Sequence, residues 1–338
     1  MMKAIGYHRS LPITDPESLI DLDLPDPTPG AHDLLVEVHA VSVNPVDVKV
    51  RARMAPADGQ PKVLGWDASG VVRAVGRDVT LFKPGDKVWY AGSLVRPGTN
   101  SELHVVDERI VGTMPATLDF AQAAALPLTT ITAWELLFDR LQVPQGREAS
   151  GQTLLVIGAA GGVGSILVQL ARQLTGLTVI GTASRPETVQ WVTELGAHHV
   201  IDHTKPLSHE LKRIGLEGVD YVASLNQTDH HFDEIVASIK PQGRLGLIDD
   251  PELVDFRKLK TKSVSLHWEF MFTRSMFGTA DQIRQHELLD RVARLIDEGV
   301  LRTTLNERFG RINAANLRRA HELIETNRAR GKIVLEGF

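Results

Sequence analysis

The sequence predicts an α/β fold with a β-rich first domain and a second domain built on a doubly wound parallel sheet. Three observations lead to this prediction. The chain has 338 residues, more than one hydrophobic core usually holds. Short apolar runs between turn residues fill residues 1–125, whereas strand and helix patterns alternate over residues 153–250. Such alternation is typical of a parallel sheet with helical crossovers.

The first domain is predicted from aliphatic and β-branched runs that proline and glycine separate. The expected strands span residues 34–43, 68–75, 87–90 and 104–106. The composition changes near residue 119, and residues 119–141 predict one or two helices with a break at Pro127. So many strands in so little sequence indicate a β domain that ends near residue 125.

The second domain repeats an apolar strand followed by a helix. Its expected strands span residues 153–157, 178–181, 199–201, 221–224 and 245–248. Beyond them we expect amphipathic helices at residues 281–298 and 314–326 and a closing strand at residues 332–335.

Charge and composition exclude several classes of protein. The formal net charge is −5, with no clustered basic face, so we expect no nucleic-acid partner. No run of 18 apolar residues occurs, and the first residues lack the apolar core of a signal peptide, so we expect no membrane span and a cytoplasmic protein.

The absence of cysteine excludes disulfides, thiolate nucleophiles and every metal site that needs a thiolate. Zinc bound through His and carboxylate ligands stays open. The 13 histidines include two adjacent pairs, His198/His199 and His230/His231. Because neighbours on a strand point to opposite faces, we expect structural or surface roles for these pairs.

The segment LLVIGAAGGVGSILVQLARQL, residues 154–174, predicts a dinucleotide site. Three glycines between a buried strand and an amphipathic helix allow a tight turn, close approach of a pyrophosphate, and close packing of helix on strand. The free N–H groups of the helix then face the phosphates. A turn without a ligand does not explain this spacing. The expected contacts are Gly158, Ala160, Gly161, Gly162, Val163 and Gly164.

The end of the next strand favours NADPH over NADH. An NAD enzyme carries an acidic residue there, which binds the ribose hydroxyls. Here Ser184 and Arg185 stand at this place, with no carboxylate before Glu187. A hydroxyl and a guanidinium suit a 2′-phosphate, which a carboxylate would repel. The alternative, that Arg185 is a surface residue that starts a helix, stays open.

Further site residues follow from strand ends and aromatic density. Ligands bind at the carboxyl ends of parallel strands, so we expect Asn226, Ile248 and Asp249 to line the cofactor site. Residues 265–279 are rich in aromatic and Met side chains, which most often indicates core or a subunit interface. The alternative is a wall for a flat substrate, with Trp268 and Phe270 on one side and Trp66 and Tyr90 on the other.

Six segments together resemble the medium-chain dehydrogenase/reductase superfamily, in its zinc-free, quinone-oxidoreductase-like branch of proteins labelled zinc-type alcohol dehydrogenase-like. They are VEVHAVSVNPVDVKVR, VLGWDASGVVRAVG, FKPGDKVWYAG, GAAGGVG, LGAHHVID and RGKIVL. The resemblance implies a GroES-like domain of residues 1–125, completed by residues 270–338, and a Rossmann domain of residues 126–269. It also implies an active site in the cleft between the domains and a homodimer.

The resemblance implies that the zinc chemistry is missing. Zinc-bearing relatives carry a Cys ligand where this chain has Asn44 and a His ligand where it has Trp66. Neither residue replaces such a ligand, and residues 85–102 hold no cysteine for a structural zinc lobe. Without a Lewis acid, reduction of an isolated ketone is harder than reduction of a quinone or an α,β-unsaturated carbonyl, in which conjugation spreads the charge.

The resemblance also suggests roles for single residues. We expect Asn44 and Tyr90 at the reacting centre, with Asn44 beside the nicotinamide and Thr129 against the same ring or its ribose. For Asn44, a plain turn role before Pro45 stays open. His203 stands where some quinone reductases carry a Tyr, and Arg330 is a weaker cofactor candidate.

The expected function is therefore a zinc-independent, NADPH-dependent reductase that transfers hydride to quinones or α,β-unsaturated carbonyls. A reductase of aldehydes or ketones is one alternative. A protein that binds NADPH and turns over little is another.

Overall fold

The computed structural model describes residues 1–57 and 59–338, which form two compact units. The first unit contains Met1–Ile131 and Phe272–Phe338, and the second contains Thr132–Met271. The sequence analysis placed these divisions at residues 125/126 and 269/270. We describe each unit by itself.

The first unit holds a seven-stranded sheet and a three-stranded sheet. In the larger sheet the order is β15-β16-β3-β5-β6-β8, and β7 also pairs with β3. The bounds are β3 Asp33–Val43, β5 Ala68–Val75, β6 Lys87–Tyr90, β7 Leu103–Asp107, β8 Val111–Thr113, β15 Leu305–Arg308 and β16 Lys332–Glu336. The smaller sheet has the order β2-β1-β4, with β1 Met2–Tyr7, β2 Ile20–Leu24 and β4 Lys62–Val63.

The helices of the first unit include a short one directly after β3. They are α1 Pro45–Arg53, α2 Phe120–Ala124, α3 Pro127–Trp134, α8 Thr273–Phe277, α9 Arg284–Asp297 and α10 Ala314–Glu325, and α3 continues into the second unit. The predicted break at Pro127 is confirmed, because α2 ends at Ala124 and α3 begins at Pro127.

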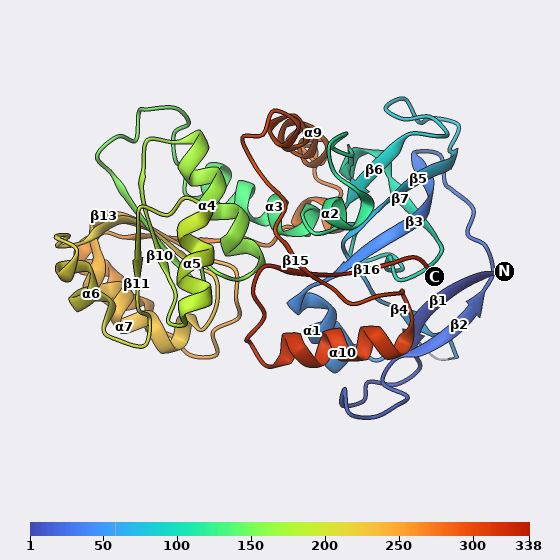
Figure 1. Ribbon diagram of the computed structural model, residues 1–338, viewed down its shortest axis with the longest axis horizontal. Helices are drawn as coiled ribbons and strands as arrows, with labels where there is room; N and C mark the ends of the chain where they lie inside the picture. Colours follow the sequence, from blue (N-terminus) through green and yellow to red (C-terminus); the bar gives the residue numbers. More distant parts are fainter. Residues whose placement is uncertain (58) are drawn as a thin grey trace. The chain divides into compact units, whose positions relative to one another are not determined.

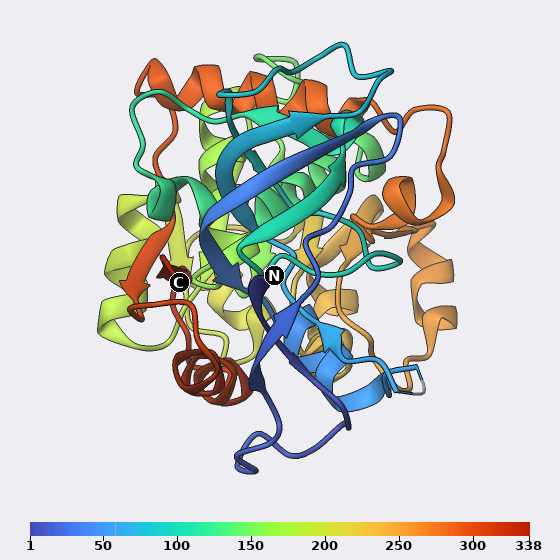
Figure 2. The same ribbon diagram turned by 90° about the vertical axis from the view of Figure 1, so that its right-hand side faces the viewer.

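Strand β3 organises the first unit because it pairs with three other strands (Figures 1 and 2). Its residues alternate between buried and half-buried positions over most of its length, as expected of a strand with one face on the core. Its neighbour β5 approaches closely at Gly70, where a Cβ would lie 2.1 Å from the Glu37 carbonyl oxygen. Only glycine allows these two backbones to come so near.

The last strand completes the first unit from far along the chain. Strand β16 runs antiparallel to the end of β3 and pairs Ile333 with Val43 and Val334 with Ser42 (Figure 1). Val334 and Ala40 form one small apolar cluster with Ala121 and Ala124 of α2 and with Ala125, the residue after that helix. This pairing brings Lys332 to the segment that links β3 to α1.

The second unit is a six-stranded, fully parallel sheet with the order β11-β10-β9-β12-β13-β14. Its strands are β9 Thr153–Ile157, β10 Thr178–Thr182, β11 His199–Ile201, β12 Val219–Ser224, β13 Ile239–Leu247 and β14 Ser265–Trp268. Helix α4 packs on β9 and β10, α5 on β10 and β11, and α7 on β12 and β13 (Figure 1). The order reverses at β9, which makes the end of β9 the topological switch point where such sheets bind ligands.

The second unit's helices are the crossovers of this sheet. They are α4 Gly162–Leu174, α5 Pro186–Glu194, α6 Leu207–Arg213 and α7 Thr228–Ser238, with a π-helical segment at Glu135–Arg140 and a 3-10 helix at Phe256–Lys262. None of the helices in the described part of the chain is long and apolar enough to cross a membrane.

The predicted strands are confirmed, and the differences have local causes. Strand β13 begins at Ile239, whereas the sequence analysis placed its start at residue 245, because the proline and glycine at positions 241 and 243 interrupt the apolar run before that residue. Its pairing with β12 is irregular between Val219 and Tyr221. The sequence analysis missed β14 because its four residues open the aromatic stretch, in which no strand pattern stands out.

Candidate functional site

The glycine loop lies at the end of β9, and the chain itself requires two of its glycines. Gly158 has φ +83°, a conformation that other residues rarely adopt. At Gly164 a Cβ would lie 2.3 Å from the Gly158 carbonyl oxygen and 2.6 Å from the Ala159 Cα. These two glycines therefore make the tight turn and the close packing of α4 on the loop that the sequence predicted.

Gly161 is different, because none of the described residues would crowd a Cβ at its position. A Cβ there would meet only the Gly158 carbonyl oxygen, at the ordinary contact distance of 3.4 Å. Its φ of −74° suits any residue, and it is the N-cap of the 13-residue helix α4. The loop thus leaves space over a helix N-terminus whose first N–H groups have no partner in the helix. Such a cradle fits the pyrophosphate of a dinucleotide.

The end of β12 lies against this loop. The Asn226 side-chain oxygen would be 2.7 Å from a Cβ at Gly158, so Asn226 borders the loop, and its contact with the cofactor stays a prediction. On the opposite side of β9, the Thr182 hydroxyl at the end of β10 accepts a 3.1 Å hydrogen bond from the Gly158 N–H. The loop is held from both neighbouring strands.

Asp249, after β13, is used within the chain. Its carboxylate accepts hydrogen bonds from the Thr228 N–H at 2.8 Å and the Thr228 hydroxyl at 2.6 Å, and so it fixes the start of α7. The contacts predicted between the cofactor and Ile248 or Asp249 remain predictions.

Ser184 and Arg185 follow β10, at the same edge of the sheet as the glycine loop. Arg185 is the N-cap of α5, and its Nε lies 3.4 Å from a Glu187 carboxylate oxygen. Its side chain is 37% exposed, so a ligand can reach the guanidinium. This position fits both interpretations of Arg185, a phosphate-binding residue and a residue that starts a helix.

His203, after β11, belongs to the same neighbourhood. Burial lowers the pKa of His203, and the positive charges of Arg185 and His230 lower it further against the opposing effect of Asp202. Its Nδ1 is buried without a hydrogen-bond partner in the described residues. An unsatisfied buried nitrogen next to a guanidinium fits a site that receives an anionic oxygen.

In the first unit, Asn44 closes a buried polar network between β3 and α1. It is the N-cap of α1, and its own N–H donates to the Asp47 carboxylate at 2.7 Å. Its amide nitrogen donates to Asp67 Oδ2 at 2.9 Å. The other oxygen of Asp67 accepts the Leu128 N–H at 2.8 Å. Asn44 is 1% exposed, so its amide is committed to this network.

Lys332, from β16, is the central cation of this network. Its ammonium donates to the Asn44 side-chain oxygen, to Asp67 Oδ2 at 3.0 Å and to the Val43 carbonyl oxygen at 3.2 Å. The sequence analysis missed Lys332 and singled out Arg330 in the same motif. Arg330 instead donates to the Asn306 side-chain oxygen at 2.7 and 3.0 Å. The signal in the sequence that could have identified Lys332 is a lysine at the start of an apolar strand.

The two carboxylates of the network are held in an environment that disfavours charge. Burial raises the pKa of Asp47 to about 7, although the Asn44 N–H and the charge of Lys332 oppose that rise. Burial also raises the pKa of Asp67, and Lys332 is the first influence that opposes it. The charge of one ammonium, that of Lys332, therefore opposes the rise in the pKa of both carboxyls.

Trp66, which the family resemblance puts at the second zinc-ligand position, is a core residue. It is 1% exposed, its indole N–H donates to the Ser93 carbonyl oxygen at 3.1 Å, and its ring meets Phe272 edge-on at 6.3 Å. Within residues 1–57 and 59–338 no group of three or more His, Cys, Asp or Glu side chains would hold a metal ion. The residues at this place do not fit zinc.

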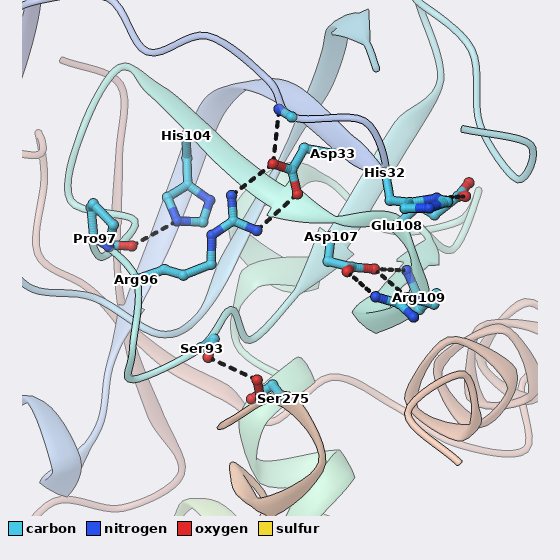
Figure 3. Close-up of polar contacts among 11 residues, drawn as sticks. His32, Asp33, Ser93, Arg96, Pro97, His104, Asp107, Glu108, Arg109 and Ser275 are labelled. Atoms are coloured by element: carbon cyan, nitrogen blue, oxygen red, sulfur yellow. Dashed lines mark hydrogen bonds and ion pairs between the residues drawn. The ribbon is translucent and has the colours of Figure 1, made fainter. Parts of the chain in front are cut away.

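Tyr90 lies in a buried pair with His104. The phenol oxygen is 3.1 Å from His104 Nδ1, and the rings stack at 5.5 Å. His104 Nε2 lies 3.0 Å from the Pro97 carbonyl oxygen, beside the ion pair of Arg96 and Asp33 (Figure 3). Burial lowers the pKa of His104 to about 4 and also raises the pKa of Tyr90. A catalytic role for Tyr90 gains no support from this position.

The remaining candidates divide by exposure. The Thr129 hydroxyl donates to the Leu126 carbonyl oxygen at 3.1 Å and is buried. Trp268 and Phe270, at the end of β14 and just after it, are about half exposed, at 50% and 47%. The next two residues, Met271 and Phe272, are buried. The aromatic stretch therefore contains both core residues and residues available to a ligand or a partner.

Comparison with known proteins places both units in one family. The chain matches a family model for the alcohol dehydrogenase GroES-like domain over residues 30–123 and one for zinc-binding dehydrogenases over residues 195–335. It is 38% identical to a zinc-type alcohol dehydrogenase-like protein of Staphylococcus epidermidis, over 99% of both chains.

Two solved structures extend the comparison. A crystal structure of a protein from Rhizobium etli CFN 42 has 60% identity to this chain and a TM-score of 0.97. The match covers 100% of this chain and 98% of that protein, which is assigned only provisionally to the zinc-dependent alcohol dehydrogenases. Escherichia coli quinone oxidoreductase, solved in complex with NADPH, has 26% identity and a TM-score of 0.82 over 99% of both chains.

Proposed function

Because the chain belongs to the medium-chain dehydrogenase/reductase superfamily, among zinc-type alcohol dehydrogenase-like proteins related to quinone oxidoreductases, we propose that it is an NADPH-dependent reductase of quinones or α,β-unsaturated carbonyls. In this proposal the reaction proceeds without zinc. The family is an oxidoreductase family, and the proposal concerns the cofactor, the substrate class and the missing metal.

The observation that carries the proposal is the open position at Gly161. The chain has room for a Cβ there and still uses glycine, directly over the N-terminus of α4. Close approach of a pyrophosphate to the backbone gives that glycine a purpose. NADPH supplies a hydride when it is bound, and the residues around Gly161 hold and orient it.

The choice of NADPH rests on Ser184, Arg185 and His203. A guanidinium, a hydroxyl and an imidazole with a free buried nitrogen suit the 2′-phosphate, whereas no acidic residue stands at the end of β10 to bind the ribose hydroxyls. The quinone oxidoreductase of Escherichia coli, which binds NADPH, supports the same choice.

The substrate class rests on the residues at the missing metal site. Asn44, Trp66 and Lys332 provide no coordination for zinc, so an isolated carbonyl oxygen would develop charge without a Lewis acid. A quinone or an enone spreads that charge by conjugation. Asn44 acts in this proposal as a positioning residue, since its amide is fixed by two charged partners.

Oxidation of NADPH by the purified protein tests the substrate class. We expect turnover with a quinone or an enone and at least tenfold less with the matching saturated ketone or aldehyde. Equal or faster turnover of saturated carbonyls would favour the aldehyde and ketone reductase instead. Tight NADPH binding without turnover of any acceptor would favour a binding protein.

Titration with both cofactors tests the cofactor choice. We expect tighter binding of NADPH than of NADH, and Arg185→Ala to weaken NADPH by roughly 10- to 150-fold while NADH hardly changes, because a hydrogen bond to a charged group contributes about 1.5 to 3 kcal/mol. The control is Arg257→Ala, since Arg257 is exposed and pairs with Asp255 elsewhere in the same unit. Equal affinities for the two cofactors in the parent protein would refute the choice of NADPH.

A further inference from the structure

The feature that the proposed function does not yet explain is a fully buried ammonium group. Lys332 and its partner Asp67 are 3% and 0% exposed. The ammonium has three protons, and the structure gives it three acceptors, on Val43, Asn44 and Asp67. Lys332 therefore has no proton left for a cofactor phosphate or a substrate oxygen.

The arrangement fixes which way the Asn44 amide points. Its oxygen faces the ammonium of Lys332, and its nitrogen faces the carboxylate of Asp67. A flipped amide would place an NH₂ group against the ammonium and an oxygen against the carboxylate, and both contacts would be repulsive. Two opposite charges thus select one orientation.

The same ammonium balances the carboxylates around it. Asp67 touches Lys332 directly, and Asp47 feels its charge from the other end of the network. A buried carboxylate without a partner is strongly destabilising. One positive charge therefore holds together a carboxamide, a carboxylate and a backbone carbonyl.

We propose that Lys332 is a built-in cation of this unit, which gathers Asn44, Asp67 and Val43 and thereby positions the Asn44 side chain for turnover. The part of this inference that concerns turnover rests on the proposed reductase function.

Lys332→Met tests the inference, because Met keeps much of the side-chain volume and removes the charge. We expect turnover with a quinone to fall by roughly tenfold or more, since the Asn44 orientation loses a charged hydrogen bond, while NADPH affinity changes by less than about threefold. Lys332→Arg should recover part of the lost turnover. Unchanged turnover in a folded Lys332→Met protein would overturn the inference.

Lys262→Met is the matched control. The Lys262 ammonium also donates to three oxygens, the carbonyls of Val236, Ala237 and Ile239 in the second unit. None of these belongs to a carboxylate or a carboxamide. This variant should lose thermal stability and keep its turnover. An equal fall of turnover in both lysine variants would mean that Lys332 acts through stability alone.

A second measurement does not depend on turnover. Asp67→Asn in the Lys332→Met background removes the carboxylate that the first change leaves unpaired, so the double variant should unfold at a higher temperature than Lys332→Met alone. The double variant also serves where Lys332→Met alone does not fold. A further loss of stability in the double variant would overturn the inference even if the protein reduced no quinone. Lack of quinone turnover in the parent protein, with the expected rise in stability, would refute the proposed function and leave the built-in cation standing.

Discussion

The glycine loop after β9 and the polar network after β3 differ in how much space the chain leaves at Gly161 and at Asn44. At Gly161 the chain leaves space that its own packing does not need. Around Asn44 the chain leaves no such space, because the Lys332 ammonium donates to the Asn44 side-chain oxygen and Trp66 donates to the Ser93 carbonyl oxygen. Gly161 therefore has room for a group from outside the chain, whereas the polar groups around Asn44 are satisfied by one another.

The largest expected effect comes from a substitution that the packing of the glycine loop does not tolerate. Gly164→Ala places a methyl group 2.3 Å from a backbone oxygen, so it should destabilise the protein by about 4 kcal/mol or more or leave none folded. Gly161→Ala meets no such obstacle and should keep the stability to within about 1 kcal/mol while it weakens NADPH binding at least tenfold. Thermal unfolding and NADPH titration of both variants provide the check. Equal destabilisation by the two changes would remove the distinction between a structural glycine and a ligand glycine.

The next effect concerns the polar network around Asn44 and the dependence of the free energy of unfolding on pH. Burial raises the pKa of Asp47 to about 7, so between about pH 4 and 7 the folded protein binds a proton that the unfolded chain does not. The free energy of unfolding should therefore fall as pH rises through this range, by about 2 to 3 kcal/mol between pH 5 and 8 from this group.

Urea unfolding at pH 5 and pH 8 measures this dependence. Asp47→Asn should flatten it, because the amide does not titrate, whereas Asp23→Asn, at an exposed position of β2, should leave it as in the parent protein. A parent protein that gains stability from pH 5 to pH 8 through Asp47 would show that the network holds this carboxyl charged.

A smaller effect is expected when Asn44 is replaced, and it should fall on turnover more than on NADPH affinity. Asn44→Ala removes the amide between Asp67 and Lys332, and we expect turnover to fall by roughly tenfold or more while NADPH affinity changes less, since a hydrogen bond to a charged group contributes about 1.5 to 3 kcal/mol. Kinetics with a quinone and titration with NADPH separate the two. Asn316→Ala, on α10, is the control. Turnover equal to that of the parent would make Asn44 a turn residue only.

The last prediction concerns removal of metal, for which we expect no change in turnover. Incubation with a strong chelator should leave turnover unchanged, and elemental analysis should find no stoichiometric zinc, because Asn44 and Trp66, which the family resemblance puts at the zinc-ligand positions, do not bind zinc. One zinc ion per chain, with activity lost on its removal, would contradict this prediction.

Sequence patterns predicted the fold because they are local. The glycine spacing from 158 to 164 and the strand of residues 153–157 appear within one short window, and the structure has them as expected. The family resemblance, through the RGKIVL motif, also indicated that the last segment completes the first domain. No local window holds the contact between Lys332 and Asn44, which are 288 residues apart and meet only because β16 pairs with β3.

Other predictions stay open because residue type alone does not fix burial. Trp66 and Tyr90 are large aromatic residues that suit a substrate wall and a core equally well, and both are buried here. Arg185 follows a strand and precedes a helix, so its position fits a phosphate contact and a helix start alike.

The pairing of β16 with β3 has a consequence for synthesis of the chain. Residues 40–43 of β3 are made early, but their partners in β16 follow only after the whole second unit. Until residue 336 has emerged from the ribosome, that end of β3 is an unpaired strand edge, and Asp67 lacks its cation. Such edges invite pairing with other chains, and contacts across so long a separation form slowly. The nascent chain therefore carries this exposed strand edge throughout the synthesis of the second unit.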